Sequence, residues 1–572
     1  MNIQNERGIA LVIALFVMVI LMGFCSVFIL RTIHESRLAK KELAMAQSFY
    51  IAEGGANAAL EELDKLVNTY MTNTINATNP STVINNTQTY ITSHDGIGFL
   101  MATVLDSGTP LLTLVGADAD YTIPASALGN GTYTCTIEIS EKTDPVTVTP
   151  DSWDFPYNYR LLVQSSADNT DKRAVLNGDF TVRVQRDNFA KYALFTNNQT
   201  TPGGSNVWFT DKTNFAGPLH TNGRFNFALN PSGTFDGLIE QTASTARFYN
   251  NGFPVLLDAD TNGTKDTPTF NAGFVRGADP ITLSSATQQQ DVVDQALGGT
   301  TVSTNGIYVP NSGGALTGGI YVKGDSTVTM AVNASDQAVY TIQQGGATKT
   351  ITVDDVNNQT TVNDGSTSTV YNGQPTGLDH VGTVIYVDGQ ISGLQGTVQK
   401  NTELTVASAN DVVIGDNIRY EDYTPGVGTP GQAGYVPPSA KDPVTGNDAK
   451  NLLGIVSWNG DVRIGTSAPD NVDIHGTVLA KNGIFQVDDY NNTGAGGRGT
   501  ATLLGGVITD NYGAFGLFNG STGTQISGYG RNFVYDGRME TGNAPPYFPS
   551  LNTFVAFTND ITDKMIWQEG ES

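Results

Sequence analysis

Five oxygen-bearing residues in the segment LLDADTNGTKDTPTF have the spacing of a calcium-binding loop. They are Asp258, Asp260, Asn262, Thr264 and Asp266, with Gly263 where such a loop turns sharply. Calcium prefers carboxylate and carbonyl oxygens, and Thr264 would offer its backbone carbonyl. Position 12 of the pattern normally supplies a bidentate glutamate, but Thr269 stands there. We therefore expect a weak Ca²⁺ site, or one completed by a carboxylate from elsewhere; an acidic surface loop built from Asx-turns is the alternative.

Four aspartates near the ends of expected strands form a second candidate set: Asp388, Asp411, Asp416 and Asp461. Some polysaccharide lyases and hydrolases built on parallel β-helices use carboxylates of this kind. Solvated turn aspartates explain the four equally well, and few basic residues lie near them. The aromatic residues Trp208, Tyr386 and Trp458 could stack on a sugar, although core packing is their commoner fate. We expect no catalytic residues and no enzyme, with a surface-displayed polysaccharide lyase or hydrolase as the alternative.

Other patterns in the chain predict no chemistry. Gly494, Gly496 and Gly499 match G-x-G-x-x-G, but a strand is expected after them where a dinucleotide site requires a helix. The five histidines contain no H-x-x-x-H pair, so no zinc site is implied. We expect His220 in PLHTNG to be a corner residue bonded to backbone. Cys135 is expected to be a small buried residue.

The composition is that of a turn-rich β protein. The chain has 572 residues, of which 64 are glycine and only 15% are charged, and average proteins have about 7% glycine and about 25% charged residues. The net charge of −25 repels nucleic acid, so we expect no nucleic-acid partner. With only Cys25 and Cys135, no disulfide framework holds the chain together.

Residues 9 to 30 form an uncharged apolar segment that is long enough to span a membrane. Its 22 residues correspond to a helix of about 33 Å. A cleaved secretory signal would have a shorter apolar region followed by small residues, but here bulky side chains continue to Arg31. The basic residues after the segment favour a cytoplasmic body, but large domains cross the membrane largely regardless of such charge. A plain signal-anchor helix is the alternative reading.

The flanks of this segment resemble the leader of type IV pilins and type II secretion pseudopilins. The leader MNIQNERG ends in Arg7-Gly8 directly before the apolar run, and the stretch AQSFYIAEGGANAALEEL resembles the amino terminus of PilX-type minor pilins. The resemblance covers residues 6 to 66 and implies that a prepilin peptidase cuts between Gly8 and Ile9. Most pilins carry glutamate at the fifth mature position, where this chain has Ile13. Because that glutamate is thought to neutralise a neighbouring subunit's amine, its absence suits a filament tip.

Helical spacing of apolar residues continues beyond the membrane segment, at Phe49, Ala52, Ala56, Ala59, Leu63 and Leu66. The sequence then predicts a linker at 67–99 and a small antiparallel β domain at 100–187, including a hairpin in YRLLVQSSADNTDKRAVLNGDFTVRV. The pilin resemblance implies that this sheet packs on the exposed half of the long helix.

From 188 to 550 the sequence favours a large right-handed parallel β-helix. Short apolar runs end in glycine or asparagine, and Gly460, Gly483 and Gly506 recur with a period of 23, which suits one coil of a β-solenoid. The Pro- and Gly-rich residues 421–450 are expected to form an inserted loop, and residues 551–572 a tail that returns as a cap strand or frays. The phrases FAGPLHTNGRF, GYGRNFVYDGRM and PPYFP resemble an uncharacterised bacterial envelope family of this architecture.

These observations predict a mainly β, non-enzymatic, pilin-like subunit of a type IV pilus or a type II secretion pseudopilus. It would present its β-solenoid for structure or adhesion. Expected partners are the inner membrane, other pilin or pseudopilin subunits, the prepilin peptidase and a carbohydrate or other surface ligand. The expected location is the inner membrane with the body in the periplasm, or an assembled extracellular filament.

Overall fold

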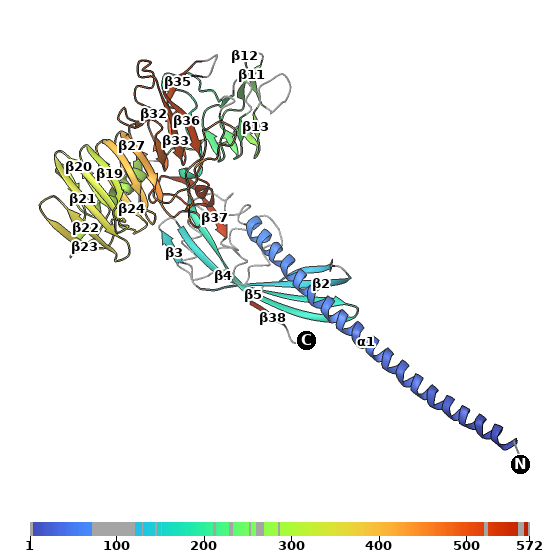
Figure 1. Ribbon diagram of the computed structural model, residues 1–572. Helices are drawn as coiled ribbons and strands as arrows, with labels where there is room; N and C mark the ends of the chain where they lie inside the picture. The colour runs from blue at the N-terminus through green and yellow to red at the C-terminus, as the bar shows by residue number, and fades with distance from the viewer. Residues whose placement is uncertain are drawn as a thin grey trace. The chain divides into compact units, whose positions relative to one another are not determined.

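The computed structural model describes most of the chain in two compact units. One unit contains residues 1–185 and 554–572, and the other contains residues 186–553. The described residues are 4–70, 120–128, 130–143, 146–149, 152–209, 213–227, 233–250, 253–258, 268–283, 286–519, 524–558 and 566–569. Within them the protein is mainly β with one long N-terminal apolar helix (Figure 1), as the sequence predicts.

The first unit consists of helix α1 (Gln4–Tyr70) and a seven-stranded sheet. The strands are β1 (Asp120–Leu128), β2 (Gly131–Glu141), β3 (Val146–Thr149), β4 (Ser152–Ala167), β5 (Thr170–Asn188), β37 (Ser550–Thr558) and β38 (Ile566–Glu569). The central order is β1-β2-β4-β5-β37, and β1, β2, β4 and β5 pair antiparallel. The predicted hairpin is β4–β5, which turns at Asp168 and Asn169 with φ of 47° and 61°.

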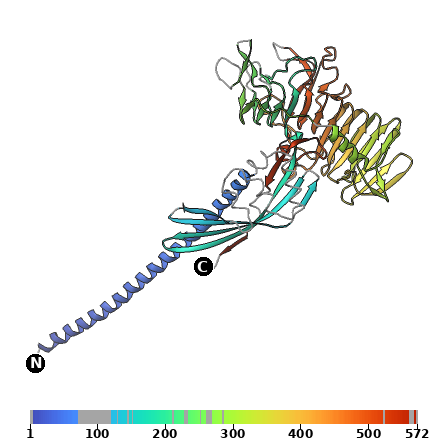
Figure 2. The ribbon, with the colours of Figure 1, turned by 180° about the vertical axis from the view of Figure 1, so that it is seen from behind.

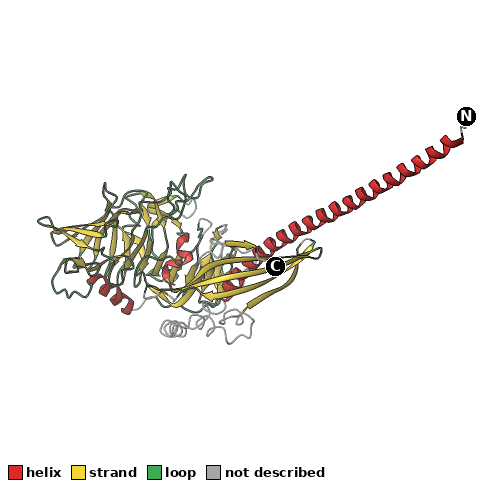
Figure 3. Cartoon of the chain, turned by 90° about the horizontal axis from the view of Figure 1, so that it is seen from below, coloured by secondary structure: helices red, strands yellow, loops and turns green. Residues whose placement is uncertain are grey.

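Helix α1 is longer than predicted, because it continues to Tyr70 instead of ending at residue 66. Residues 71–99 of the expected linker lie outside the described part of the chain. The expected tail contributes β37 and β38 to the sheet, where Ile566 to Glu569 pair antiparallel with β5. In Figure 3, where helices are red, α1 is the longest helix of the chain's described part.

The second unit contains an eleven-stranded sheet in which almost all neighbours are parallel. In spatial order its strands are β14 (Phe274–Arg276), β10 (Ile239–Gln241), β7 (Leu219–Thr221), β6 (Leu194–Asn198), β34 (Val507–Asn511), β31 (Thr477–Ala480), β28 (Leu452–Ser457), β26 (Glu403–Ser408), β24 (Thr383–Asp388), β18 (Ile320–Lys323) and β15 (Gly306–Tyr308). Only the end strand β15 pairs antiparallel with its neighbour, β18.

The chain does not follow this sheet from one end to the other. It starts in the middle at β6 and runs out to β14. Later it enters at the opposite end and returns strand by strand to β34, which pairs with β6. Helix α4 (Ala286–Leu297), which the sequence analysis did not predict, lies in the connection between the two runs.

The second large sheet of this unit has fifteen strands, and Figure 2 shows the ribbon of the chain from behind. Its main order is β16 (Asn311–Ser312), β17 (Ala315–Leu316), β23 (Ser368–Asn372), β22 (Gln359–Asn363), β21 (Ala347–Asp354), β20 (Ala338–Gln344), β19 (Ser326–Val332), β25 (Ile391–Val398), β27 (Val412–Tyr420), β30 (Asp473–His475), β33 (Gly497–Leu504), β36 (Gln525–Val534) and β35 (Gly516–Phe518). The strands β29 (Val462–Ile464) and β32 (Phe485–Val487) pair beside β27.

Smaller sheets complete the unit: β8 (Asn226–Phe227) with β11 (Ala246–Asn250) and β12 (Phe253–Leu257), and β9 (Thr234–Phe235) with β13 (Thr269–Phe270). The short helices η3 (Phe189–Lys191) and η4 (Gly537–Thr541) flank the large sheets in sequence.

The parallel pairing predicted for all of residues 188–550 is wrong for β19 to β23, which form an antiparallel meander. Short turns of two to five residues explain the difference, since parallel neighbours need a longer connection. Between β20 and β21 the turn is Gly345-Gly346, both with positive φ, and this conformation matches the twist of an antiparallel hairpin.

One row of apolar residues crosses ten of the eleven strands of this sheet, all but β15, and faces the core. The row is Ile320, Ile385, Val406, Ile455, Val478, Val507, Leu194, Leu219, Ile239 and Phe274. All but Phe274 are buried. Burial of one such aliphatic side chain contributes about 1.5–3 kcal/mol to stability, so the row holds the strands in a single register.

The glycine period of 23 has only a partial structural basis. A Cβ at Gly460 would lie 2.7 Å from the backbone nitrogen of Asp411, and one at Gly483 would lie 2.5 Å from an oxygen of Asp461, so these two glycines occupy equivalent corners. Gly506 instead precedes β34, where its added Cβ would meet the carbonyl of Tyr192. Including Gly506 in the same repeat was therefore wrong.

The three phrases FAGPLHTNGRF, GYGRNFVYDGRM and PPYFP meet along one segment, residues 535–551, which we call the strap. Tyr535 donates a hydrogen bond to the carbonyl of Lys191 at 2.8 Å, and its ring fills the space above Gly217. Tyr547 donates to the carbonyl of Thr376 at 2.5 Å. Each phrase therefore has a packing role in the second unit.

Candidate functional site

The amino-terminal half of α1 presents an apolar surface that no described part of the chain covers. The large apolar side chains from Ile9 to Leu30 are 44–71% exposed. This is the one helix among the described residues that is long and apolar enough to cross a membrane. A soluble surface rarely exposes such a stretch, which therefore indicates a lipid or protein environment.

The carboxyl-terminal half of the same helix is buried against the sheet of the first unit. Its buried residues are Ala44, Ser48, Ile51, Ala52, Gly55, Ala56, Ala59, Leu60 and Leu63. They recur every three or four residues, pack on β2 and β4, and share one core with buried side chains of β5. Phe49, expected on this face, is 44% exposed; it falls between the buried positions of the helical repeat. The side chain of Leu66 lies outside the described set.

Small residues let α1 approach the sheet closely. A Cβ on Gly55 would lie 2.7 Å from the ring of Tyr133 and 3.1 Å from Val163. Ser48 and Ser165 are buried together, and the hydroxyl of Ser165 donates to the carbonyl of Ser48 at 2.7 Å. Cys135 is fully buried in this core, and burial raises the pKa of its thiol to about 12. The prediction of a small buried residue at this position is confirmed.

The predicted processing residues lie in the exposed part of the helix. Gly8 and Ile9 are helical and exposed. Ile13 is 56% exposed, on a stretch with no carboxylate between residues 9 and 30.

Only Asp258 of the predicted calcium loop belongs to the described residues, and it is exposed after β12. Asp260, Asn262, Thr264 and Asp266 lie outside them. Among the described residues, no group of three or more His, Cys, Asp or Glu side chains is arranged to hold a metal. The calcium site stays a prediction.

Two of the four aspartates of the second candidate set have separate local partners. Asp388 accepts hydrogen bonds from Tyr321 and Lys323, both at 3.0 Å. Asp416 accepts from the backbone of its neighbour, Asn417, at 2.6 Å.

Asp411 and Asp461 are brought together on successive turns of the chain. Asp411 accepts from the backbone nitrogen of Asp461 at 2.9 Å and from Arg463 at 3.0 Å. Burial, and to a lesser degree the charge of Asp411, raise the pKa of Asp461. Arg463 also bonds Asp488 at 2.9 Å, so the guanidinium is held between two carboxylates, an arrangement that fixes the corner.

His220 is buried in β7 and its ring is hydrogen-bonded to the side chain of Asn222, which corrects the expectation of a corner residue bonded to backbone. Its Nε2 lies 3.1 Å from Oδ1 of Asn222, and its Nδ1 lies 3.6 Å from Glu240 on the parallel neighbour β10. The nearby imidazole of His220 lowers the pKa of the Glu240 carboxyl. The imidazole also stacks on Phe195, with ring centroids 5.2 Å apart.

The three aromatic residues considered for sugar stacking do not form a common platform. Trp458 and Tyr386 are buried in one core, and the hydroxyl of Tyr386 accepts a hydrogen bond from Gln289 at 3.0 Å. Trp208 is partly exposed elsewhere, beside β8. Gly494 and Gly496 precede strand β33 and Gly499 lies within it, so a strand and not a helix follows the glycine pattern, as predicted.

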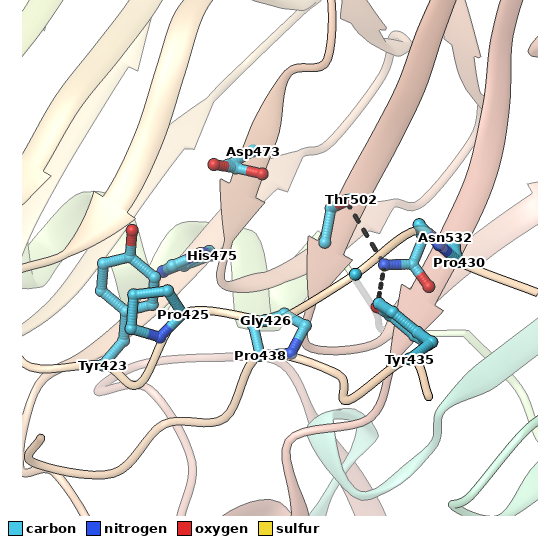
Figure 4. A pocket seen from close by; sticks show the side chains of 11 residues that line it. Tyr423, Pro425, Gly426, Pro430, Tyr435, Pro438, Asp473, His475, Thr502 and Asn532 are labelled. Carbon is cyan, nitrogen blue, oxygen red and sulfur yellow. Dashed lines mark hydrogen bonds between the residues drawn. The ribbon is translucent and has the colours of Figure 1, made fainter. Parts of the chain in front are cut away.

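Sequence reasoning missed a pocket of about 180 Å³ between the predicted loop 421–450 and the fifteen-stranded sheet. Asp473 of β30, Thr502 of β33 and Asn532 of β36 are direct neighbours in the strand register and form its floor. Residues of the loop cover this row (Figure 4): Tyr423, Pro425, Gly426, Gly428, Pro430, Tyr435 and Pro438. The spacing of the three polar residues, which is about thirty, gives no sequence signal.

Hydrogen bonds hold the loop in a defined conformation over the sheet. Backbone bonds link Thr424 with Ser439 and Val427 with Val436 in both directions, at 2.8–3.0 Å. The amide nitrogen of Asn532 lies 2.6 Å from the hydroxyl of Tyr435. The loop is therefore a hydrogen-bonded hairpin that lies over the sheet. Its prolines further restrict the backbone conformation.

One end of the pocket is a buried, uncharged histidine. Nδ1 of His475 accepts the backbone N–H of Tyr420 at 3.0 Å, and the ring of Tyr423 packs edge-on against the imidazole at 4.5 Å. Burial, together with the charges of Arg419 and Arg538, lowers the pKa of His475 to about 3. The imidazole is therefore neutral at physiological pH and forms a fixed wall.

Comparisons with known proteins give two matches. Residues 154–243, from β4 to β10, match a family described as a domain of unknown function (DUF4900). Among solved structures, the competence-associated pilin ComZ from Thermus thermophilus is similar over 77% of this chain and 84% of that chain, with 12% sequence identity and a TM-score of 0.28. A TM-score this low carries no argument about fold or function. A search of curated proteins finds no match.

Proposed function

We propose that this protein is a non-enzymatic, pilin-like subunit of a type IV pilus or a type II secretion pseudopilus. The observation that carries the proposal is the division of α1 into two halves with opposite surroundings. The half from residue 9 to 30 is apolar and exposed, and the half from Ala44 to Leu63 is buried against an antiparallel sheet. A membrane-anchored subunit that later packs its helix among other subunits needs this division.

The second unit would be the part that the subunit presents. Two large sheets, whose strands mostly pair in parallel along successive turns of the chain, support a right-handed parallel β-helix. We propose that this body serves a structural or adhesive role on the cell surface or filament. The bonded carboxylates of the aspartate set favour this role over catalysis.

We propose that the subunit sits at a filament tip, for a reason of charge. An exposed helix without a carboxylate at Ile13 offers no partner for a buried terminal amine on the next subunit, and an unpaired buried charge is costly. A terminal subunit would have no such neighbour. The proposed partners are the inner membrane, other pilin or pseudopilin subunits and a prepilin peptidase.

Mass spectrometry of the mature amino terminus tests the proposal. Cleavage between Gly8 and Ile9 is the expected result in cells with a prepilin peptidase, and Gly8→Val should abolish it. Gly23→Val is a matched control within the same helix and should be cleaved normally. An intact leader in wild type, or a start beyond residue 24, would contradict the pilin-like assignment.

A further inference from the structure

The pocket under the loop 421–450 combines a polar floor with an apolar roof. Asp473, Thr502 and Asn532 lie in one row across three neighbouring strands. The roof carries the rings of Tyr423 and Tyr435 and three prolines. Such a combination of a few convergent polar groups with aromatic surface is typical of small-molecule sites.

The oxygen atoms on the floor define the ligand chemistry. Both hydrogen bonds from Arg419 to Asp473 go to Oδ2, at 3.0 and 2.7 Å. The amide nitrogen of Asn532 is committed to Tyr435 at 2.6 Å and Thr502 at 3.4 Å. Within the described part of the chain, no hydrogen bond occupies Oδ1 of Asp473 or Oδ1 of Asn532. Two acceptors therefore remain for a ligand that donates.

Charge selects among donors. A carboxylate on the floor disfavours an anionic ligand, and the chain's net charge of −25 adds to that effect. Arg419 already pairs with Asp473 at 2.7 Å, so a ligand cation would enter a site whose carboxylate is balanced. Neutral hydroxyl groups satisfy the acceptors without a net charge.

Size and rigidity limit the ligand further. A volume of about 180 Å³ is below the range of pockets for drug-sized molecules, about 300–1,000 Å³. The loop is fixed by paired backbone hydrogen bonds, and His475 is held by Tyr420 and Tyr423. A preformed pocket of this kind loses little entropy on binding.

We propose that this pocket binds one neutral sugar ring, as a free monosaccharide or as the terminal unit of a glycan. Ring hydroxyls would donate to Asp473 and Asn532, and the apolar face of the sugar would lie against Tyr423 or Tyr435. The site is independent of the helix-based proposal above, since every residue that lines it belongs to the second unit.

Saturation-transfer NMR on the full chain in lipid nanodiscs tests this site, because sugar-headed detergents would compete. The probes are D-glucose, D-galactose, D-mannose and N-acetyl-D-glucosamine at millimolar concentration, with D-glucuronate and glycine betaine as charged probes. We expect transfer to at least one neutral sugar and none to the charged probes. No transfer to any neutral sugar, or stronger transfer to a charged probe, would overturn the proposal.

Variants tie the signal to the pocket. Asn532→Ala removes one acceptor and should weaken binding roughly fivefold or more; Tyr435→Phe, which keeps the ring, should have a smaller effect in the same direction. Val444→Ser is the matched control, because Val444 is 90% exposed in the same loop and does not line the pocket. Equal binding by wild type and both pocket variants, with unchanged melting temperatures, would place the ligand elsewhere and reject the proposal.

A linear tetrasaccharide of the bound sugar distinguishes a free monosaccharide from the terminal unit of a glycan as the ligand. If the terminal unit of a glycan is the ligand, its end residue should show the strongest transfer. If only the free monosaccharide fits, the tetrasaccharide should show none. Strongest transfer to internal units would contradict a pocket that accepts one ring.

Discussion

Gly55 of α1 lies so close to Tyr133 of β2 that an added Cβ would be 2.7 Å from the tyrosine ring. Glycine inside a helix costs about 1 kcal/mol relative to alanine, so its presence here reflects the close approach of helix and sheet. Close contact at small residues such as Gly55, together with the buried apolar side chains, holds α1 against the sheet.

Gly55→Ala should therefore destabilise the first unit despite its better helix propensity. Overpacking costs about 1–3 kcal/mol, which outweighs the gain of about 1 kcal/mol. Thermal unfolding followed by near-ultraviolet circular dichroism checks this. Gly23→Ala is the control, since nothing lies within 4 Å of its added Cβ, and it should not lower the melting temperature. A melting temperature for Gly55→Ala at or above wild type would disprove the close packing.

A buried ion pair within the strap holds the arginine that fastens the strap to the rest of the second unit. Arg538 and Asp536 have side chains only 5% and 2% exposed, and Arg538 also donates to the carbonyls of Ala449 and Asn451 at 2.7 and 2.8 Å. Arg538→Met leaves Asp536 as an unpaired buried charge and should cost about 3–5 kcal/mol. Chemical denaturation measures the loss.

Lys441→Met is the comparison for this experiment, because its pair with Asp448 is 52% and 65% exposed. We expect a change below about 1 kcal/mol. Equal effects of the two substitutions would show that burial of the Arg538 pair does not matter for stability.

His475 should make the second unit less stable in mild acid. Its pKa is lowered from 6.5 to about 3 in the folded state, so between these values the unfolded chain binds a proton that the native state does not. Above pH 6.5 the imidazole is neutral in both states and does not lower the free energy of unfolding. As the pH drops from 6.5 toward 3, this group lowers the free energy of unfolding by at most about 1.4 kcal/mol per pH unit. Denaturation midpoints at pH 7 and pH 4.5 measure the loss.

His475→Asn keeps a neutral acceptor for the N–H of Tyr420 and should reduce that pH dependence. Carboxylates elsewhere titrate equally in both proteins, so the difference between them isolates the histidine. Identical pH profiles for the two proteins would show that the imidazole is protonated as easily in the native state as in the unfolded state.

Calcium should stabilise the body if the loop 258–266 binds it. At one hundred times the dissociation constant, binding to the native state alone contributes about 2.7 kcal/mol. Calorimetry should show a higher melting temperature with millimolar calcium for wild type and for Asp279→Ala, which changes an exposed aspartate outside the loop. Asp258→Ala combined with Asp260→Ala should abolish the shift; a retained shift would place the ion elsewhere.

Few copies per filament are expected of this subunit. A body of some 370 residues on one helix leaves little radial room for a copy at each step of a filament, since domains typically have 50–250 residues. Immunogold labelling of residues 190–550 should mark filament ends or scattered surface sites. Dense labelling along filaments would contradict both the packing argument and the interpretation of Ile13.

Local patterns in the sequence predict the elements that depend on nearby residues. The apolar helix, the hairpin β4–β5 and the strand after Gly499 follow from periodicity and turn residues. Phe49 fits the helical spacing but is exposed. A spacing of three or four residues admits more than one helical face, and the position of the sheet decides which face is buried.

The features that sequence reasoning missed depend on distant segments. Asp473, Thr502 and Asn532 become neighbours only through strand register. The apolar face of helix α4 is Val292, Val293, Ala296 and Leu297, which spans fewer than two turns and is too short a pattern to predict a helix. The role of the strap phrases depends on the distant partners of Tyr535 and Tyr547, which are the carbonyls of Lys191 and Thr376.

The pairing of β6 with β34 has a consequence in time. Asn197 and Asp510, which bond at 2.8 Å across these strands, are 313 residues apart. A ribosome that adds about 5–20 residues per second takes ~15–60 s to make that stretch. During this interval one edge of β6 has no native partner and is free to pair with a strand of another nascent chain. The yield of correctly folded protein should therefore depend on how densely ribosomes occupy the message, a quantity that the stability of the finished molecule does not report.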